Sequence, residues 1–278
     1  MKKILNYIPV IILAIAIVVS SCNKKDVNLI DENNKWIYLD SSNSANIKLI
    51  QVFAGNTPQI PTAPNLTTGP QVFIYANGKK LNGTALSYGG VWPTSNVYGN
   101  IPEGNTRFDI INARMDLTVV PNLPKFNAGD TLATFTATLT KGKYYSLYIG
   151  DTVPAVMVTI KEDDLIVPDY QTYKIRVANL LMNPLDTLTL FSRRQNAEII
   201  SDITHKNISN WVQLPLPVIS DTLEYRKKGT VVTYITALVG TGTSPTFSPT
   251  GLRMYTVVAR GKIGITAKGN TASIITNR

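Results

Sequence analysis

The chain has 278 residues, and 27 Lys and Arg against 18 Asp and Glu give it a formal charge of +9. Hydrophobic residues at 44% with charged residues at 16% support a packed core and exclude a largely disordered protein. One His and one Cys argue against structural zinc, a disulfide framework and His-dependent nucleophilic catalysis, so we expect no enzyme, no cofactor and no metal site.

Residues 1–21 have the pattern of a signal peptide. Lys2 and Lys3 precede an apolar run at residues 8–19, which ends at the small pair Ser20 and Ser21. A helix over these 12 residues would rise only ~18 Å, short of the roughly 30 Å hydrocarbon core of a membrane. We therefore expect the segment to be cleaved rather than to span the membrane.

The chain's only cysteine follows directly. Residues 19–22, Val-Ser-Ser-Cys, resemble the lipobox of bacterial lipoproteins. The resemblance implies cleavage before Cys22, diacylation of its thiol and acylation of the new amino terminus. Several acyl chains anchor a protein durably, because each buried methylene contributes about 0.8 kcal/mol. We expect a lipid-anchored envelope protein, with an ordinary secretory signal as the alternative.

Residues 22–44 are polar and rich in Asn, with one apolar island at residues 36–39, and predict a flexible tether. The mature chain keeps 25 basic residues against 18 acidic ones, or +7, because cleavage removes two lysines. Its cationic pairs are scattered along the chain, at residues 79–80, 193–194 and 227–228. This distribution predicts solvated surface, a membrane as the first partner, and no nucleic-acid partner.

Strand signals recur through the rest of the chain. Residues 131–139 alternate apolar and polar side chains, and similar alternation surrounds Tyr145 and Tyr173. The dipeptides Asn77-Gly78 and Asn82-Gly83 are typical of hairpin turns. The class is predicted to be all-β.

A weak internal repeat divides the mature chain. The first match pairs residues 47–49 with 175–177 at an offset of 128. The next two, at an offset of 115, pair residues 73–75 with 188–190 and residues 108–110 with 223–225. The last pairs Tyr145 with Tyr255 at an offset of 110. The difference between the first two offsets predicts a long loop at residues 55–70. We predict one β-sandwich at residues 45–165, a second at 166–278, and a linker at 162–169.

The first copy carries Val72–Lys79, Ile101–Gly104, Phe108–Ile110 and Lys143–Tyr148 in that order. This pattern resembles the domain of unknown function numbered forty-three ninety-seven, which is common in tandem in outer-membrane lipoproteins of Gram-negative bacteria. The resemblance covers residues 45 to about 261 and implies immunoglobulin-like or transthyretin-like sandwiches at the outer membrane, facing the periplasm or the exterior. It supplies no catalytic residues.

Few constellations suggest chemistry. Glu162, Asp163, Asp164 and Asp169 could offer oxygen ligands to calcium, although a solvated linker fits their spacing better. His205 is predicted to be a polar loop residue. Trp92 and Tyr98 lie in a Pro-containing loop, where aromatic faces could contact a ligand or close the end of a core.

Four places read Asp, Thr and then an aliphatic residue, which resembles the acceptor rule of periplasmic O-glycosylation systems. The candidate acceptors are Thr131, Thr152, Thr187 and Thr222. The alternative is that Asp-Thr marks turns that lead into strands.

Three functions remain open at this point. The first is a non-catalytic, lipid-anchored protein that presents tandem sandwiches for binding or adhesion to envelope or extracellular components. The second is a surface glycan-binding lipoprotein beside an outer-membrane importer. The third, a hydrolase using Asp109 with Glu103, is disfavoured because Asp109 alternates with apolar neighbours as an outward strand residue does.

Overall fold

The computed structural model describes residues 43–53, 71–94, 96–113, 127–152, 155–182, 186–236, 246–261 and 271–278. The predicted signal peptide, the lipidation site Cys22, the tether up to residue 42 and the long loop at 55–70 lie outside these ranges. The elements within them are all strands, so the all-β prediction is confirmed. No helix in the described ranges is long and apolar enough to cross a membrane.

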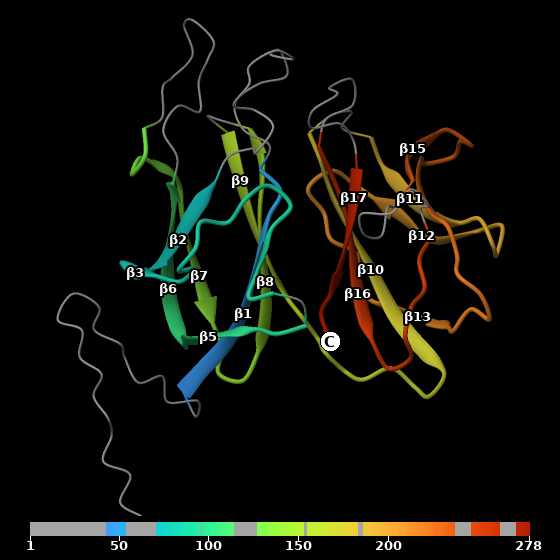
Figure 1. The fold of residues 1–278 in the computed structure, drawn as a ribbon, viewed down its shortest axis with the longest axis horizontal. Helices are drawn as coiled ribbons and strands as arrows, with labels where there is room; N and C mark the ends of the chain where they lie inside the picture. Colours follow the sequence, from blue (N-terminus) through green and yellow to red (C-terminus); the bar gives the residue numbers. More distant parts are fainter. Residues whose placement is uncertain are drawn as a thin grey trace, which may run out of the picture. The chain divides into compact units, whose positions relative to one another are not determined.

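The first sandwich consists of two facing sheets (Figure 1). One sheet has the order β4 (Val91–Trp92), β1 (Ser44–Gln51), β8 (Tyr144–Thr152) and β9 (Ala155–Glu162), and β5 (Gly99–Pro102) also pairs with β1. The other sheet has the order β3 (Lys79–Lys80), β2 (Val72–Ala76), β6 (Gly104–Asn112) and β7 (Thr131–Leu139).

The second sandwich repeats this plan. Its first sheet has the order β13 (Val212–Pro215), β10 (Thr172–Leu181), β16 (Met254–Gly261) and β17 (Thr271–Thr276). Its second sheet has the order β12 (Ala197–Ile203), β11 (Leu188–Ser192), β14 (Leu223–Lys227) and β15 (Thr233–Thr236). The strands thus divide into two sandwiches on either side of residues 163–171.

The strand register reproduces most of the sequence repeat. β1 pairs in parallel with β8, and Ile47 lies opposite Tyr145. β10 pairs in parallel with β16, and Ile175 lies opposite Tyr255. The offsets of 128 and 110 therefore relate equivalent positions of the two sandwiches.

One predicted match is wrong by a single residue. Ile110 pairs with Ile74, and Tyr225, which is equivalent to Ile110, pairs with Leu190. The offset between β2 and β11 is therefore 116, the difference between 74 and 190, rather than 115. Because strand side chains alternate between faces, the predicted match would exchange the core face of β11 with its outer face.

The two Asn-Gly dipeptides behave differently. Asn77 and Gly78, with φ angles of 49° and 77°, form the predicted tight turn between β2 and β3. The second prediction is wrong, because Asn82 is fully buried: its Oδ1 accepts the Ile74 amide at 2.7 Å and its Nδ2 donates to the Val72 carbonyl at 3.0 Å. The side chain satisfies backbone groups of β2 in place of a neighbouring strand.

The two sandwiches share a buried apolar contact. Each has its own core, and a third cluster joins them: Ile50, Val52 and Tyr148 from the first, with Ala178, Leu180, Ile208, Val258 and Ile275 from the second. Residues Leu39–Arg278 accordingly form one compact unit. The β1–β8–β9 sheet and the β10–β16–β17 sheet are thus buried on both faces, one toward the core and one toward the other sandwich.

Candidate binding site at the junction of the two sandwiches

A buried ion pair lies at the centre of the junction. Arg176 on β10 and Asp163, just after β9, have side chains 1% and 0% exposed, and Arg176 Nη2 lies 2.5 Å from Asp163 Oδ1. The guanidinium also donates from Nε to Thr256 Oγ1 at 2.9 Å and from Nη2 to the Tyr148 hydroxyl at 3.1 Å. Burial opposes the charged form, but Tyr148 and Asp163 raise the pKa of Arg176 above its ordinary value. The arginine is therefore a permanent buried cation.

Asp163 overturns the expectation of a wholly solvated linker. Its Oδ2 accepts hydrogen bonds from the Ser146 hydroxyl at 2.5 Å and from the Tyr98 hydroxyl at 2.6 Å. Its neighbours Glu162 and Asp164 are exposed, as predicted. The sequence signal was misleading because three consecutive acids look alike, and only the strand register shows which one turns inward.

The network has a partial internal symmetry. Lys48 lies opposite Ser146 in the first sandwich, as Arg176 lies opposite Thr256 in the second. Asp163 accepts a hydrogen bond from Ser146, and Asn277 accepts one from Thr256 at 2.7 Å. The two repeats therefore meet through equivalent faces, on which a cation and a carbonyl-bearing side chain occupy matching positions.

Lys48 connects the two sandwiches in the opposite direction. Its Nζ donates to the Thr276 carbonyl at 2.8 Å, and the whole residue is buried. Burial lowers the pKa of Lys48 to about 8, although the nearby Asp163 carboxylate opposes the shift. Unlike Arg176, Lys48 is thus a buried cation that can lose its proton in mildly alkaline solution.

Each buried cation faces an aromatic ring. Lys48 Nζ lies 4.5 Å from the centre of the Tyr98 ring, and Arg176 Cζ lies 4.3 Å from that of Trp211. Tyr98 precedes Gly99, which pairs with Ile47, and Trp211 precedes Val212, which pairs with Ile175. Tyr98 and Trp211 are therefore equivalent positions of the two repeats.

A surface pocket of about 420 Å³ opens beside the Arg176–Trp211 pair. It is lined by both sandwiches: Lys161, Glu162 and Asp164 on one side, and Lys174, Arg176, Asn210, Trp211 and Gln213 on the other. Its volume is within the range of small-ligand sites. Within the described ranges, the buried Nη1 of Arg176 has no hydrogen-bond partner, so the pocket borders an unsatisfied donor.

Some polar groups of the pocket already have partners. Lys174 Nζ donates to the Ile166 carbonyl at 2.9 Å, Glu162 pairs with Lys143 at 2.9 Å, and the Gln213 amide donates to Asp169 Oδ2 at 2.7 Å. Among the ion pairs of the described ranges, none includes Lys161 or Asp164. An aromatic face beside ammonium, carboxylate and amide groups suits a ligand that is apolar on one face and rich in hydroxyl or carbonyl groups on the other.

The predicted ligand contacts Trp92 and Tyr98 lie elsewhere. Trp92 lies opposite Leu49 and packs against the first core, and a Cβ on Gly99 would come within 2.6 Å of its ring. Tyr98 is held in the junction, where its hydroxyl donates to Asp163 and accepts from Asn277 at 3.0 Å. Burial raises the pKa of the Tyr98 hydroxyl. A ligand contact through either residue stays a prediction.

Sequence reasoning did not single out Trp211. Its neighbourhood, Asn210-Trp211-Val212, contains no Pro and no second aromatic residue to mark a loop. The signal that could have found it is the repeat, because continuing the match from Ile47 and Ile175 into their partner strands places Trp211 at the position of Tyr98.

The other predicted residues have ordinary environments. Asp109 accepts from Thr134 Oγ1 at 2.6 Å and from Arg107 Nε at 3.0 Å on the outer side of β6. The hydrogen bond from Thr134 lowers the pKa of the Asp109 carboxyl. Glu103 accepts from the Lys141 amide. Within the described ranges, no three acidic, His or Cys side chains gather in a way that could hold a metal.

The proposed glycosylation sites differ in access. Thr131 is exposed at the start of β7, whereas Thr187 and Thr222 are half-buried, and the side chain of Thr152 lies outside the described set. Asp130 Oδ2 accepts the Asn127 amide at 2.6 Å, and Asp221 Oδ1 accepts the Thr222 amide at 2.7 Å. These contacts are those of turn-forming Asp residues, which favours the structural interpretation at two of the four places.

No protein-family model and no curated protein sequence matches the chain. Among solved structures, the chain is similar to a leucine-rich repeat protein from Bacteroides thetaiotaomicron VPI-5482, with 13% identity and a TM-score of 0.19, over 82% of this chain and 27% of that one. A candidate adhesin from Bacteroides ovatus has 10% sequence identity and a TM-score of 0.18, and the match covers 82% of this chain and 91% of that one. A candidate cell-adhesion protein from Parabacteroides distasonis ATCC 8503 has 10% sequence identity and a TM-score of 0.18, and the match covers 84% of this chain and 100% of that one.

Proposed function

We propose that this chain is a non-catalytic, lipid-anchored protein of the cell envelope that binds an envelope or extracellular component. The observation that carries the binding role is the pocket over the Arg176–Trp211 pair, which both sandwiches line. The lipobox-like residues 19–22 support the anchor. The resemblance of the first copy to the domain of unknown function numbered forty-three ninety-seven supports a place at the outer membrane.

The junction explains why two repeats would be kept in one chain. The pocket needs Lys161 from β9 and Trp211 before β13, so neither sandwich forms it alone. The buried Arg176–Asp163 pair and the shared apolar cluster hold the two sides together. A ligand site between two firmly packed domains requires little reorganisation on binding, which favours affinity.

A second candidate is binding of a glycan beside an outer-membrane importer. The observation that favours it is Trp211, because a flat indole face stacks on the apolar face of a sugar ring while Asn210, Asp164 and Lys161 supply polar contacts. Affinity electrophoresis of the unmodified chain and of Trp211→Ala on a panel of polysaccharides tests it. Retardation that the variant loses supports glycan binding, and equal mobility on every glycan contradicts it.

A pull-down from native membranes tests the broader proposal. The chain with Trp211→Ala and Lys161→Ala should lose a partner that the unmodified chain retains, because both side chains line the pocket. Lys79→Ala is the matched control, since Lys79 is exposed and is absent from the pocket lining. A partner retained equally by all three chains would move the binding site away from the junction.

A further inference from the structure

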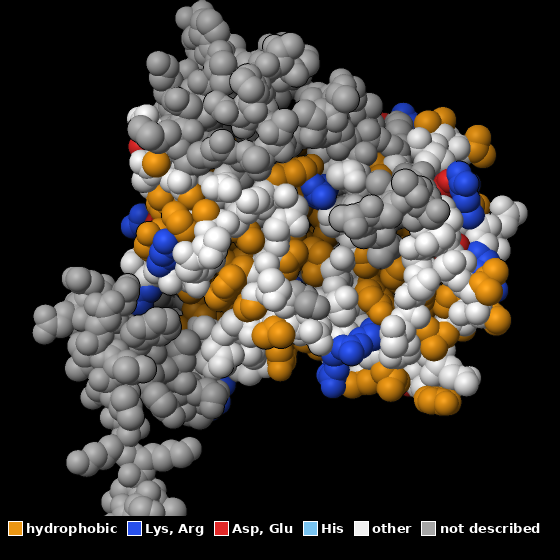
Figure 2. Space-filling model, in the orientation of Figure 1, with side chains coloured by type: hydrophobic (Ala, Val, Ile, Leu, Met, Phe, Trp, Pro, Cys, Tyr) orange, Lys and Arg blue, Asp and Glu red, His pale blue; other side chains and the backbone are white. Residues whose placement is uncertain are grey.

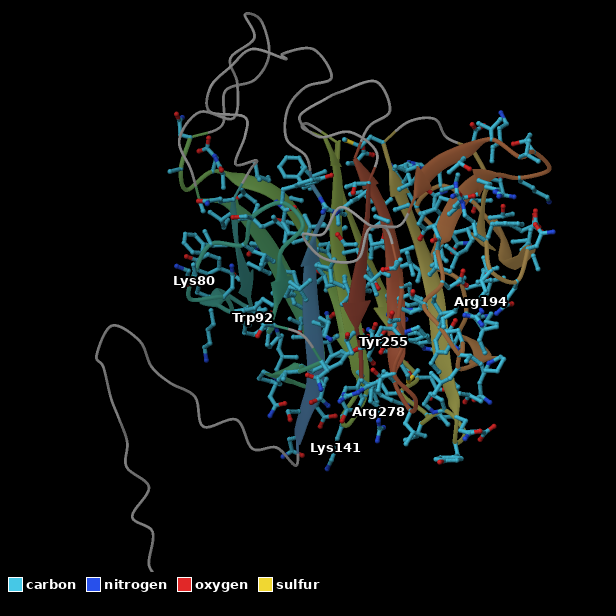
Figure 3. The ribbon with its side chains drawn as sticks, turned by 45° about the vertical axis from the view of Figure 1, so that its right-hand side comes forward. Lys80, Trp92, Lys141, Arg194, Tyr255 and Arg278 are labelled. Atoms are coloured by element: carbon cyan, nitrogen blue, oxygen red, sulfur yellow. The ribbon has the colours of Figure 1, made fainter. Side chains whose placement is uncertain are left out.

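One end of the fold is where the chain arrives from its predicted tether. We call it the tether end: β1, β8, β10 and β16 begin there, and β9 and β17 end there. Two contacts hold the segment that joins the sandwiches against the second sandwich at this end: Arg278 Nη1 donates to the Leu165 carbonyl at 2.9 Å, and Lys174 Nζ donates to the Ile166 carbonyl. Figure 3 shows Lys141 and Arg278 beside the beginning of β1.

Exposed apolar side chains gather at the tether end. Among the described residues, ten large hydrophobic side chains are exposed, and five of them lie at or just before the beginnings of β8, β10 and β16: Tyr144 at 36%, Ile166 at 62%, Val167 at 43%, Tyr170 at 81% and Leu252 at 45%. Figure 2 shows hydrophobic and basic side chains together along the lower edge of the molecule. Three of the five lie in the segment that joins the sandwiches, which could have been polar without loss to either core.

Charge contributes less than the apolar side chains. Directly beside the ends of these strands lie the basic residues Lys141, Lys143, Lys174, Arg253 and Arg278 and the exposed acids Glu103, Glu162, Asp164 and Asp169. Five cations against four anions leave +1. The combination of exposed Ile, Val and Tyr with long basic side chains suits the interfacial layer of a membrane, where aromatic rings and snorkelling cations are stable.

The position of the anchor indicates which surface covers this end. In the sequence, 20 residues separate Cys22 from Asn43, the first described residue, and Asn43 accepts the Glu103 amide at the tether end. The opposite end of β10, a strand of 10 residues, is about 33 Å away at ~3.3 Å per residue. An anchor at Cys22 therefore favours the tether end over the opposite end as the part of the fold nearest the lipid.

We propose that the tether end rests on the membrane leaflet that holds the lipid anchor, with Ile166, Val167 and Tyr170 in its interfacial layer. This rests on the proposed anchor. Asp164 and Lys174 line the junction pocket and also belong to the tether end, so the pocket opens close to the leaflet. Its ligand would accordingly be one that lies along the membrane surface.

Chemical tethering tests the orientation without cellular lipidation. The chain from residue 22 onward is coupled through Cys22, its only thiol, either to a maleimide lipid in phosphatidylethanolamine–phosphatidylglycerol vesicles or to soluble maleimide–polyethylene glycol. Hydroxyl-radical labelling followed by mass spectrometry then measures access to Tyr170. We expect labelling of Tyr170 to fall at least threefold on vesicles, while the peptide with Val231 and Val232, which are 85% and 51% exposed in the turn after β14, is unchanged.

Two outcomes would overturn the proposal. Equal labelling of Tyr170 in both conjugates would show that this end does not meet the membrane, and protection that grows with protein concentration in the soluble conjugate would assign the surface to a second copy. The variant Ile166→Ser, Val167→Ser, Tyr170→Ser should restore labelling of Leu252 on vesicles, whereas Val231→Ser, Val232→Ser should not. Failure of the anchor itself is read separately, from the mass of Cys22 in protein purified from its native envelope.

Discussion

Two buried cations, Arg176 and Lys48, occupy equivalent positions of the two sandwiches but differ in chemistry. Arg176 pairs with a carboxylate, whereas Lys48 has a carbonyl acceptor at Thr276 and a ring face at Tyr98. A buried ion pair contributes little net stability, but removal of one partner leaves an uncompensated charge. The two positions should therefore respond in opposite ways to the loss of their charge.

Arg176→Met should lower the free energy of unfolding by about 3–5 kcal/mol, because Asp163 would stay buried without its cation. Arg176→Met combined with Asp163→Asn should recover part of that loss. Urea denaturation followed by circular dichroism measures both variants. Additive losses in the double variant would contradict the pairing.

The lowered pKa of Lys48 predicts that the free energy of unfolding rises with pH. Burial lowers its pKa to about 8 from 10.5 in the unfolded chain, so between these values the unfolded chain binds more protons than the folded one. From pH 8 to 9.5, Lys48 should add about 1.5 kcal/mol to the free energy of unfolding, and above pH 10 the buried tyrosines act in the opposite direction.

The variant Lys48→Met should lack this rise and should be at least as stable as the unmodified chain at pH 7.5, because it removes a desolvated cation. Urea titrations of both chains at pH 7.5, 8.5 and 9.5 provide the comparison. Parallel curves for the two chains would assign the pH dependence to other groups.

The proposed glycosylation also belongs to the residue scale. Thr131 is the exposed member among the described candidates, so it should carry sugar before Thr187 or Thr222 does. The intact mass of protein from its native envelope, compared with that of Thr131→Ala, measures this. A mass equal to polypeptide plus lipid in both chains would contradict the proposed glycosylation.

At the scale of elements, alternation predicted strands well and their outer faces poorly. The period of two at residues 131–139 corresponds to β7, whose Thr134, Thr136 and Thr138 are exposed as expected. In β8 and β10 the same alternation occurs, but the polar residues Ser146 and Arg176 are buried too, because they face the other sandwich instead of solvent. A polar residue on an alternating strand indicates the non-core face, and sequence pattern alone cannot distinguish water from a polar interface.

The joining segment gives a prediction at this scale. Limited proteolysis should cut within residues 165–170, where Ile166, Val167 and Tyr170 are exposed, but the two fragments should stay together. The apolar cluster of Ile50, Tyr148 and Val258 and the Arg176–Asp163 pair cross the cut without depending on it. Native size-exclusion chromatography should show one peak, and two separated fragments would contradict the shared junction.

At the scale of the whole molecule, the two predicted sandwiches pack against each other within one compact unit. The repeat was readable because equivalent strands keep similar residues. The domain limits at 45–165 and 166–278 stay a prediction, and no described strand crosses residues 163–171. The junction could not be predicted from the sequence, because it depends on which of several similar acidic and aromatic residues contact each other in the folded chain. The pocket beside Trp211 is a product of that junction.

Anchoring is a property of the whole chain. Cys22→Ser should move the protein from the membrane pellet to the soluble fraction after a carbonate wash, because the thiol would no longer carry acyl chains. Fractionation and immunodetection measure the distribution. Persistence of the variant in the washed membranes would contradict the lipid anchor.

Site-specific photocrosslinking in the native envelope tests most directly whether the junction is the binding site. A photoreactive amino acid at Lys161, in the pocket, is compared with one at Val231, which is exposed and is absent from the pocket lining. We expect a discrete adduct from position 161 that disappears when Trp211→Ala is combined with it, and none from position 231. An absent adduct at position 161, or one that survives Trp211→Ala unchanged, would contradict a ligand site at the junction.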